Sequence, residues 1–290
     1  MDLSTKTERL AMTSTNTPRS ESKTALPVSH GRFVWYDLLT TDVAAATSFY
    51  TNIAGWATHE LDMGLGRKYQ VWTADDVPLG GVVRLKPETG LPGTPPHWVG
   101  AVAVADVDAT VRQAVVLGGK ILTHPMSIPE VGRYAVIGDP QGAVIALVTP
   151  VQPAEPALFA PKLSEFSWHE LVTTNHETAF SFYSTLFGWK QMGEHDMGSA
   201  VGAYLMFGQP MSASDTAAYG GMYTAPPAVP MPPSWLYYIR VESADDAAGM
   251  VKSLGGQVLA GPMDVPSGDR IAQCLDPQGG IFALHSVTQR

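Results

Sequence analysis

Two places in the sequence set a carboxylate two residues after a tryptophan: Trp35 and Asp37 in "FVWYDLLTTD", and Trp168 and Glu170 in "FSWHELVTTN". Residues two apart on a β-strand point to the same face of the sheet, so each pair would share one face. A tryptophan can stack on a flat or extended apolar ligand. The carboxylate beside it could accept hydrogen bonds from that ligand or, if burial raises its pKa, act as a general base.

One difference between the two segments bears on metal binding, because His169 stands where the first segment has Tyr36. Strand alternation sets His169 on the face opposite to Glu170, which favours a hydrogen-bonded histidine under the helix layer. A register change of one residue would reverse this orientation. His169, Glu170 and His285 are therefore the alternative metal candidates, although strict alternation does not allow all three to point to one face.

Arg133 and Arg270 occupy matching places before the two "DP" pairs. Each could contact a ligand and neutralise the inward carboxylate of its own domain, Asp37 or Glu170. A salt bridge to the aspartate of the neighbouring "DP" is the alternative. The sequence leaves both open.

The chain repeats itself. Phe33, Tyr50 and Trp56 recur 133 residues later, and both "LGG" and "DPQG" recur 137 residues later. Self-similarity over this length indicates two copies of one domain. We predict a disordered N-terminal tail (1–30), a first domain (31–149), a Pro-rich linker (150–163) and a second domain (164–288).

Each copy alternates strand and helix patterns. Asp42 is a suitable N-cap for the apolar stripe of "VAAATSFYTNIAG", which Gly55 closes, and Asn175 caps the matching helix. Strand-like pieces follow, and the pattern then begins again within the same copy. The prediction is an α+β fold of two tandem domains, each made of paired β-α-β-β-β units whose mixed sheet curls around a cleft.

Composition narrows the class of partner. The 290 residues carry a net charge of −9 and contain no basic run, which argues against a nucleic-acid surface. The single cysteine excludes an intrachain disulfide, and no apolar stretch has the length of a membrane span. We expect a small-molecule partner, a cytoplasmic location, and a monomer rather than a homodimer, because a tandem chain already supplies two domains.

The repeated "D…FY…GW", "LGG" and "DPQG" segments resemble those of the vicinal oxygen chelate superfamily, which includes glyoxalase I, extradiol dioxygenases and bleomycin-resistance proteins, and in particular its tandem glyoxalase-like members. The resemblance implies divalent metal ligands of the His, Gln or Glu type on the first, fifth and last strands. At those positions this sequence has only apolar side chains: Trp35, Val99 and Ala146 in copy one, and Trp168, Leu236 and Ala283 in copy two. We therefore predict no metal cofactor at the family position.

Two functions remain open at this point. The first is a protein that binds a small, partly apolar molecule in aromatic-lined clefts, with Trp35, Trp168, Arg133 and Arg270 contacting the ligand. The second is an enzyme, either with Asp37 or Glu170 acting alone or as a metal-dependent lyase, dioxygenase or hydroxylase with non-standard ligands. The sequence does not decide whether the protein is catalytic.

Overall fold

The computed structural model describes eight stretches of the chain: 30–62, 68–85, 94–129, 131–151, 161–199, 201–209, 218–226 and 231–288. Nearly all of the expected N-terminal tail, and residues 152–160 of the expected linker, lie outside the described residues. The two proposed domains come before and after these linker residues in the sequence.

Each domain has the predicted order of two successive β-α-β-β-β units. The first domain consists of β1 (Phe33–Thr40), α1 (Val43–Ala54), β2 (Ala57–Asp62), β3 (Lys68–Ala74), β4 (Val77–Arg84), β5 (His97–Ala103), α2 (Val107–Val116), β6 (Lys120–Ile128), β7 (Gly132–Gly138) and β8 (Val144–Pro150). The second consists of β9 (Phe166–Thr173), α3 (His176–Phe187), β10 (Lys190–Asp196), β11 (Ala203–Gly208), β12 (Gly220–Thr224), β13 (Ser234–Arg240), α4 (Ala244–Ser253), β14 (Gln257–Asp264), β15 (Arg270–Leu275) and β16 (Ile281–Ser286).

The strands of each domain form one eight-stranded mixed sheet. Its order is β2-β3-β4-β1-β5-β8-β7-β6 in the first domain, and the second domain repeats it as β10-β11-β12-β9-β13-β16-β15-β14. β1 runs parallel to β4 and β5 parallel to β8, whereas β1 and β5 pair antiparallel at the centre. The two β-α-β-β-β units of a domain therefore meet at their first strands, and the predicted fold class is confirmed.

The residues predicted to begin and end the first helix of each domain do so in the structure. The side chain of Asp42 accepts a hydrogen bond from the N–H of Ala45, and Asn175 does the same for Thr178. At the other end Gly55 has a left-handed backbone with φ of 70°, a conformation that a side chain would disfavour. These caps fix the point at which the chain returns to the sheet.

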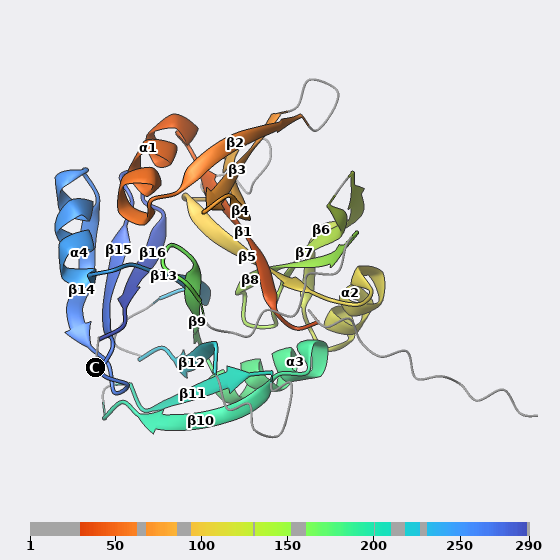
Figure 1. The fold of residues 1–290 in the computed structure, drawn as a ribbon. Coiled ribbons are helices and arrows are strands. Elements are labelled where there is room, and N and C mark those ends of the chain that lie inside the picture. Colours follow the sequence, from red (N-terminus) through yellow and green to blue (C-terminus); the bar gives the residue numbers. More distant parts are fainter. Residues whose placement is uncertain are drawn as a thin grey trace, which may run out of the picture.

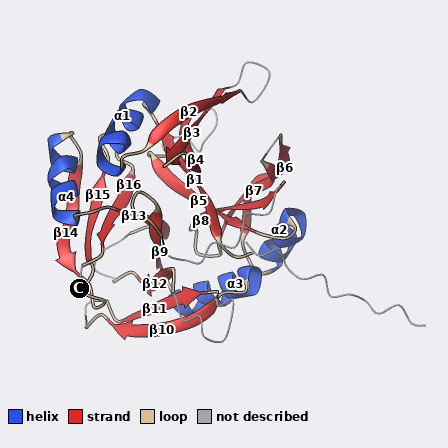
Figure 2. Cartoon of the chain, viewed as in Figure 1, coloured by secondary structure: helices blue, strands red, loops and turns tan. Residues whose placement is uncertain are grey.

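The helix-covered faces of the two sheets share one continuous hydrophobic core that contains residues of both domains. Two pairs of helices flank this core, and each pair has one helix from each domain: α1 lies beside α4, and α2 beside α3 (Figures 1 and 2). The contacts are reciprocal. Tyr50 donates a hydrogen bond to Asp276 Oδ2 at 3.1 Å, and Tyr183 donates to Asp139 Oδ2 at 2.9 Å. The tyrosine of "FY" and the aspartate of "DPQG" thus join the two domains.

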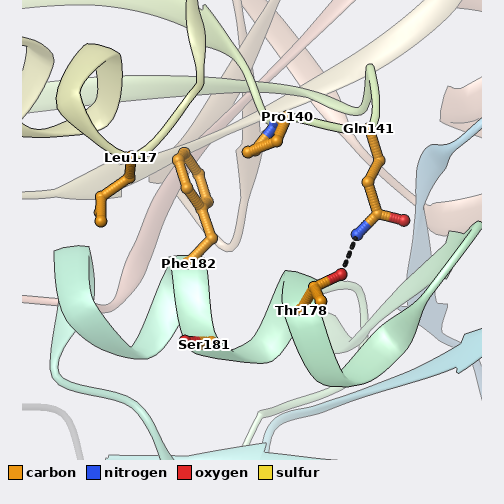
Figure 3. Close-up of a pocket in the computed structure, with 6 residues that line it drawn as sticks. All are labelled: Leu117, Pro140, Gln141, Thr178, Ser181 and Phe182. Carbon is orange, nitrogen blue, oxygen red and sulfur yellow. Dashed lines mark hydrogen bonds between the residues drawn. The ribbon is translucent and has the colours of Figure 1, made fainter.

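One contact of this interface lacks its counterpart. Gln141, from the "DPQG" turn of the first domain, reaches the N-terminus of α3 in the second domain (Figure 3). Its Oε1 accepts the N–H of Asn175 at 2.6 Å, and its Nε2 donates to Thr178 Oγ1 at 3.1 Å. The equivalent Gln278 has a buried Oε1 with no hydrogen-bond partner among the described residues. The two halves of the interface therefore differ in detail.

Among the described residues, no helix is both long and apolar enough to cross a membrane.

Candidate functional site

The face of each sheet opposite its helices, called the inner face from here on, carries the tryptophan and the carboxylate singled out in the sequence. In the first domain Trp35 pairs with Ala101, and Asp37 with Val99, across β1 and β5. Trp35 packs in a small apolar cluster that is separate from the shared core and includes Val99, Ala101 and Ala146. Strand alternation therefore places both side chains where the sequence analysis expected them.

Asp37 takes part in a three-residue hydrogen-bond network. The indole Nε1 of Trp35 donates to Tyr69 Oη at 2.8 Å and to Asp37 Oδ1 at 3.3 Å, and Tyr69 itself donates to the same carboxylate oxygen. Burial raises the pKa of Asp37, and the hydrogen bonds from Tyr69 and Trp35 offset part of that increase. The carboxylate is thus half-buried and held by uncharged donors.

The second domain repeats this network. Trp168 Nε1 donates to Tyr204 Oη at 2.8 Å, and Tyr204 donates to Glu170 Oε2 at 3.0 Å. Only 7% of Glu170 is exposed. Burial raises its pKa to about 7, although hydrogen bonds from Tyr204 and Tyr238 lower it. At neutral pH this carboxyl group therefore exchanges between its protonated and ionised forms.

A glycine allows each tyrosine to reach its carboxylate. Tyr69 lies on β3, and β4 separates it from β1, so its ring must cross the intervening strand at Gly81. A Cβ at Gly81 would lie 2.0 Å from Tyr69 Oη, and one at Gly221 would lie 2.1 Å from Tyr204 Cε1. Any larger residue at these two positions would displace the tyrosine and open the network.

The second domain surrounds its carboxylate with more polar groups than the first. Tyr238 pairs with Trp168, whereas Ala101 pairs with Trp35 at the matching place. Gln273 likewise replaces Val136, as the partners of these two residues on β16 and β8 show. Gln273 Nε2 lies 3.5 Å from both Glu170 Oε1 and Tyr238 Oη, at the outer limit of a hydrogen bond.

Comparison with known proteins follows the same division into two copies. The model of the Glyoxalase/Bleomycin resistance protein/Dioxygenase superfamily matches residues 32–147 and again residues 165–284. The chain belongs to this superfamily.

Two named relatives extend over most of the chain. A Mycobacterium bovis protein that is provisionally named a glyoxylase, CFP32, is 34% identical over 252 residues, which is 86% of this chain and 92% of that protein. The anthracycline biosynthesis protein DauV of Streptomyces sp. strain C5 is 30% identical over 265 residues, or 88% of this chain and 92% of the relative.

Solved structures of the superfamily share the fold at lower identity. A Mn(II)-bound glyoxalase from Novosphingobium aromaticivorans matches with a TM-score of 0.58 and 18% identity, over 90% of this chain and 83% of that one. The 2,3-dioxygenase LapB from Pseudomonas sp. KL28 matches with a TM-score of 0.59 and 13% identity, over 89% and 92% of the two chains. At such identities the likeness concerns the fold alone.

The positions at which the resemblance implied metal ligands carry side chains that do not suit a metal ion. The inner-face clusters bring together the six residues counted in the sequence: Trp35, Val99 and Ala146 in the first domain, and Trp168, Leu236 and Ala283 in the second. Valine, leucine and alanine have no ligating atom, and the tryptophan indole is a donor only. These positions cannot supply the nitrogen or oxygen ligands that divalent ions prefer.

His169 lies on the helix-covered face, in the orientation that strand alternation predicts. It is 1% exposed and stacks on Phe33 with ring centroids 4.0 Å apart. Its Nε2 shares a hydrogen bond with Tyr36 Oη at 2.6 Å, and its Nδ1 lies 2.7 Å from the carbonyl oxygen of Tyr219. Burial lowers the pKa of His169 to about 4, so its ring is neutral near pH 7. The Nε2 atom therefore bonds across the domains, to Tyr36, whereas Nδ1 bonds within the second domain, to Tyr219.

The alternative metal cluster of His169, Glu170 and His285 does not form. His285 pairs along β13 with Arg240, and Glu170 with Leu236, so about 13 Å of strand separates the two. The ring of His285 instead contacts Ser167 Oγ at 2.8 Å and Asp269 Oδ2 at 3.4 Å. Within the described stretches, no three His, Cys, Asp or Glu side chains are grouped closely enough to hold a metal ion.

The pairings predicted for the two arginines, with the inward carboxylates or with the aspartates of the "DP" pairs, are wrong. Arg133 forms a two-pronged salt bridge with Asp108 of α2 at 2.8 and 2.9 Å. Arg270 pairs with Asp245 of α4 and, at 2.8 Å, with Asp264. Both arginines therefore lie on the helix-covered side of the sheet, away from Asp37 and Glu170. The physical reason is alternation, because their strand neighbours are the residues that reach the inner-face clusters.

Sequence reasoning missed the tyrosines that complete both networks, Tyr69 and Tyr204, together with Gln273. The signal was present as repeated "GG" pairs at 80–81 and 220–221, each preceded by a strand that carries one of these tyrosines. A glycine inside a strand often marks a close approach by another group.

Proposed function

We propose that the protein binds a small, partly apolar organic molecule on the inner faces of its domains, without a metal ion at the superfamily's usual position. One observation carries this proposal. The same Trp–Tyr–carboxylate network occurs in both domains, on a face whose other side chains are mostly apolar and at which the resemblance implied metal ligands.

The chemistry of this face suits such a ligand. The half-buried rings of Trp35 and Trp168 offer flat apolar surface, and each carboxylate beside them offers a hydrogen-bonding group. Mostly apolar walls with a few placed polar groups are the usual composition of small-molecule sites. The anthracycline biosynthesis relatives DauV and DnrV support a fused-ring aromatic ligand.

The test is a fluorescence titration with a hydroxylated anthraquinone, comparing the wild type with Trp35→Ala and Trp168→Ala. We expect saturable quenching of tryptophan emission that is lost in whichever variant removes the binding face. Val116→Ala is the matched control, since this α2 side chain is 85% exposed on the far side of the sheet. Quenching that persists undiminished in the double variant Trp35→Ala, Trp168→Ala would contradict the proposal.

A second candidate function, proton abstraction from the bound molecule, is favoured by Glu170. A general base is most effective when its pKa lies near the working pH, and burial brings the pKa of Glu170 to about 7. Enzyme-dependent incorporation of deuterium into the α-position of hydroxyacetone in D2O, absent in Glu170→Gln, would support it. Equal exchange in wild type and variant would exclude Glu170 as the base.

The proposal includes a monomeric, cytoplasmic protein. Its two domains already contact each other through reciprocal bonds such as Tyr50–Asp276 and Tyr183–Asp139, which leaves these surfaces occupied within one chain. Light scattering on the eluting protein should give the mass of a single chain, 31.0 kDa. Twice that mass would show a dimer.

A further inference from the structure

Glu170 lies in a ring of aromatic side chains from four strands. Trp168 precedes it by two residues on β9, and Tyr204, Tyr223 and Tyr238 come from β11, β12 and β13. The rings of Tyr204 and Tyr223 are stacked, with centroids 6.0 Å apart. Tyr238 is buried, whereas Trp168, Tyr204 and Tyr223 are each partly open to solvent. A ligand reaching Glu170 would therefore meet aromatic faces.

The two oxygens of Glu170 are unequally used. Oε2 accepts the hydrogen bond from Tyr204 at 3.0 Å. Oε1 lies 3.5 Å from Gln273 Nε2, at the outer limit of a hydrogen bond, and Tyr238 is a further donor to this carboxyl group. Oε1 is thus the atom that can take a stronger partner without breaking the network.

No cation among the described residues neutralises this carboxylate. Within the described residues, the ion pairs of lysine, arginine and histidine all involve other acids. The parts of the second domain outside the described residues, at 200, 210–217 and 227–230, contain no lysine, arginine or histidine. Because an ionised carboxylate is costly to bury without a partner, a cationic ligand would stabilise the ionised form of Glu170.

The first domain lacks this arrangement. The places of Tyr223 and Tyr238 are taken there by Val83 and Ala101, as the strand registers show. Asp37 is also shorter by one methylene, and both of its hydrogen bonds fall on the same oxygen, Oδ1. Asp37 has the aromatic side chains of Trp35, Tyr69 and Tyr134 near it instead, so the set of four around the carboxylate is a property of the second domain.

We propose that the second domain binds the ammonium group of an organic cation, with Glu170 Oε1 as its counter-ion and the surrounding aromatic rings as its walls. This inference rests on the proposed function and specifies its ligand class. Aromatic faces attract cations through the ring quadrupole, and they do so most strongly where water is excluded. A tetraalkylammonium group has no N–H and needs no hydrogen-bond acceptor, so the site suits a quaternary ammonium group as well as a protonated amine.

The pH dependence of binding follows from the groups that face Glu170. These are Tyr204, Tyr223 and Tyr238, and burial raises the pKa of each well above neutrality, so none ionises between pH 6 and 8. Glu170 itself passes from mostly protonated to mostly ionised over that range. A permanently charged ligand should therefore bind about tenfold more tightly at pH 8 than at pH 6.

The experiment compares benzyltrimethylammonium with its uncharged isostere neopentylbenzene, by tryptophan fluorescence at pH 6 and pH 8. We expect the ammonium compound to bind more tightly at pH 8 and to show the tenfold dependence, and the isostere to show no pH dependence. Glu170→Gln should remove the preference for the cation, whereas Glu242→Gln, an exposed acid of the same domain, should retain it.

The outcomes separate the two proposals. Equal, pH-independent binding of both compounds, or an unchanged cation preference in a folded Glu170→Gln variant, would overturn the ammonium site and leave the proposed function standing. If neither compound binds at millimolar concentration, both the ammonium site and the proposed function are overturned. The comparison of the two ligands uses the wild-type protein, so it decides the matter even if the variant fails to fold.

Discussion

Replacing Glu170 with glutamine is expected to stabilise the protein above pH 8 and to change its stability by less than about 1 kcal/mol near pH 5. Glutamine has almost the same shape as protonated glutamic acid and retains an oxygen that can accept the hydrogen bond from Tyr204. The variant therefore removes the ionisation of this side chain while preserving its packing.

The sign follows from the two pKa values. In the unfolded chain Glu170 ionises at its ordinary pKa of 4.5, whereas burial in the folded protein raises the pKa to about 7. Between these values the folded state retains a proton that the unfolded state has released, so wild-type stability falls as the pH rises. The loss is complete once the pH has passed the folded pKa.

The difference between 4.5 and about 7 corresponds to about 3 kcal/mol of unfolding free energy, most of it lost between pH 5 and pH 8.5. The assay is urea unfolding of wild type and Glu170→Gln at these two pH values, with Glu242→Gln as the exposed control. Comparing variants at each pH cancels the contributions of other titrating groups. If the difference in unfolding free energy between wild type and Glu170→Gln is the same at both pH values, Glu170 has an ordinary pKa and the reasoning is refuted.

Three further predictions concern packing, and urea unfolding checks each. Gly221→Ala should lower the free energy of unfolding by about 1–3 kcal/mol, because its Cβ would lie 2.1 Å from Tyr204 Cε1. It should also weaken ligand binding. Unchanged stability and binding would show that the tyrosine has another route to the carboxylate. Tyr183→Phe should lower the free energy of unfolding by about 1–3 kcal/mol, because it removes the buried hydrogen bond to Asp139 of the first domain. A solvent-exposed hydrogen bond would not give a loss of this size. Gln141→Ala should lower the free energy of unfolding by about 1 kcal/mol, because the N-terminus of α3 loses its hydrogen bonds from the first domain. Gln278→Ala should lower it less, because Gln278 Oε1 has no hydrogen-bond partner among the described residues, and equal losses would contradict this.

Local signals were sufficient to predict the elements and the orientation of β1 and β9. The helix ends followed from Asp42, Asn175 and the glycines after each helix, because capping depends on a few adjacent residues. Alternation along one strand then placed Trp168 and Glu170 on one face and His169 on the other.

The missing parts of the site depend on contacts between strands that are not sequence neighbours. Tyr204 reaches Glu170 only because β12 lies between β11 and β9 and carries a glycine where the ring crosses. Its contact requires the registers of two strand pairs, which no single segment specifies. Arg133 was misplaced for a related reason, since its face follows from the pairing of β7 with β8 and not from its distance to the "DP" turn.

The reciprocal interface gives the repeated motifs a structural explanation. Tyr50 and Asp276, like Tyr183 and Asp139, belong to motifs by which the superfamily was recognised, yet they bond across the two domains. The inner-face residues are distinct from these motifs. Likeness in the motifs therefore indicates the fold and the domain pairing, whereas under the proposed function the choice of ligand would depend on other residues, such as Glu170 and Gln273.

The most direct test of the central claim is calorimetric titration of an aromatic ligand into protein treated with a chelator, repeated after addition of Mn²⁺. We predict the same affinity and stoichiometry under both conditions, with binding weakened in Trp168→Ala. Binding that appears only when the metal is present, and is indifferent to Trp168, would contradict a metal-independent site on the inner face.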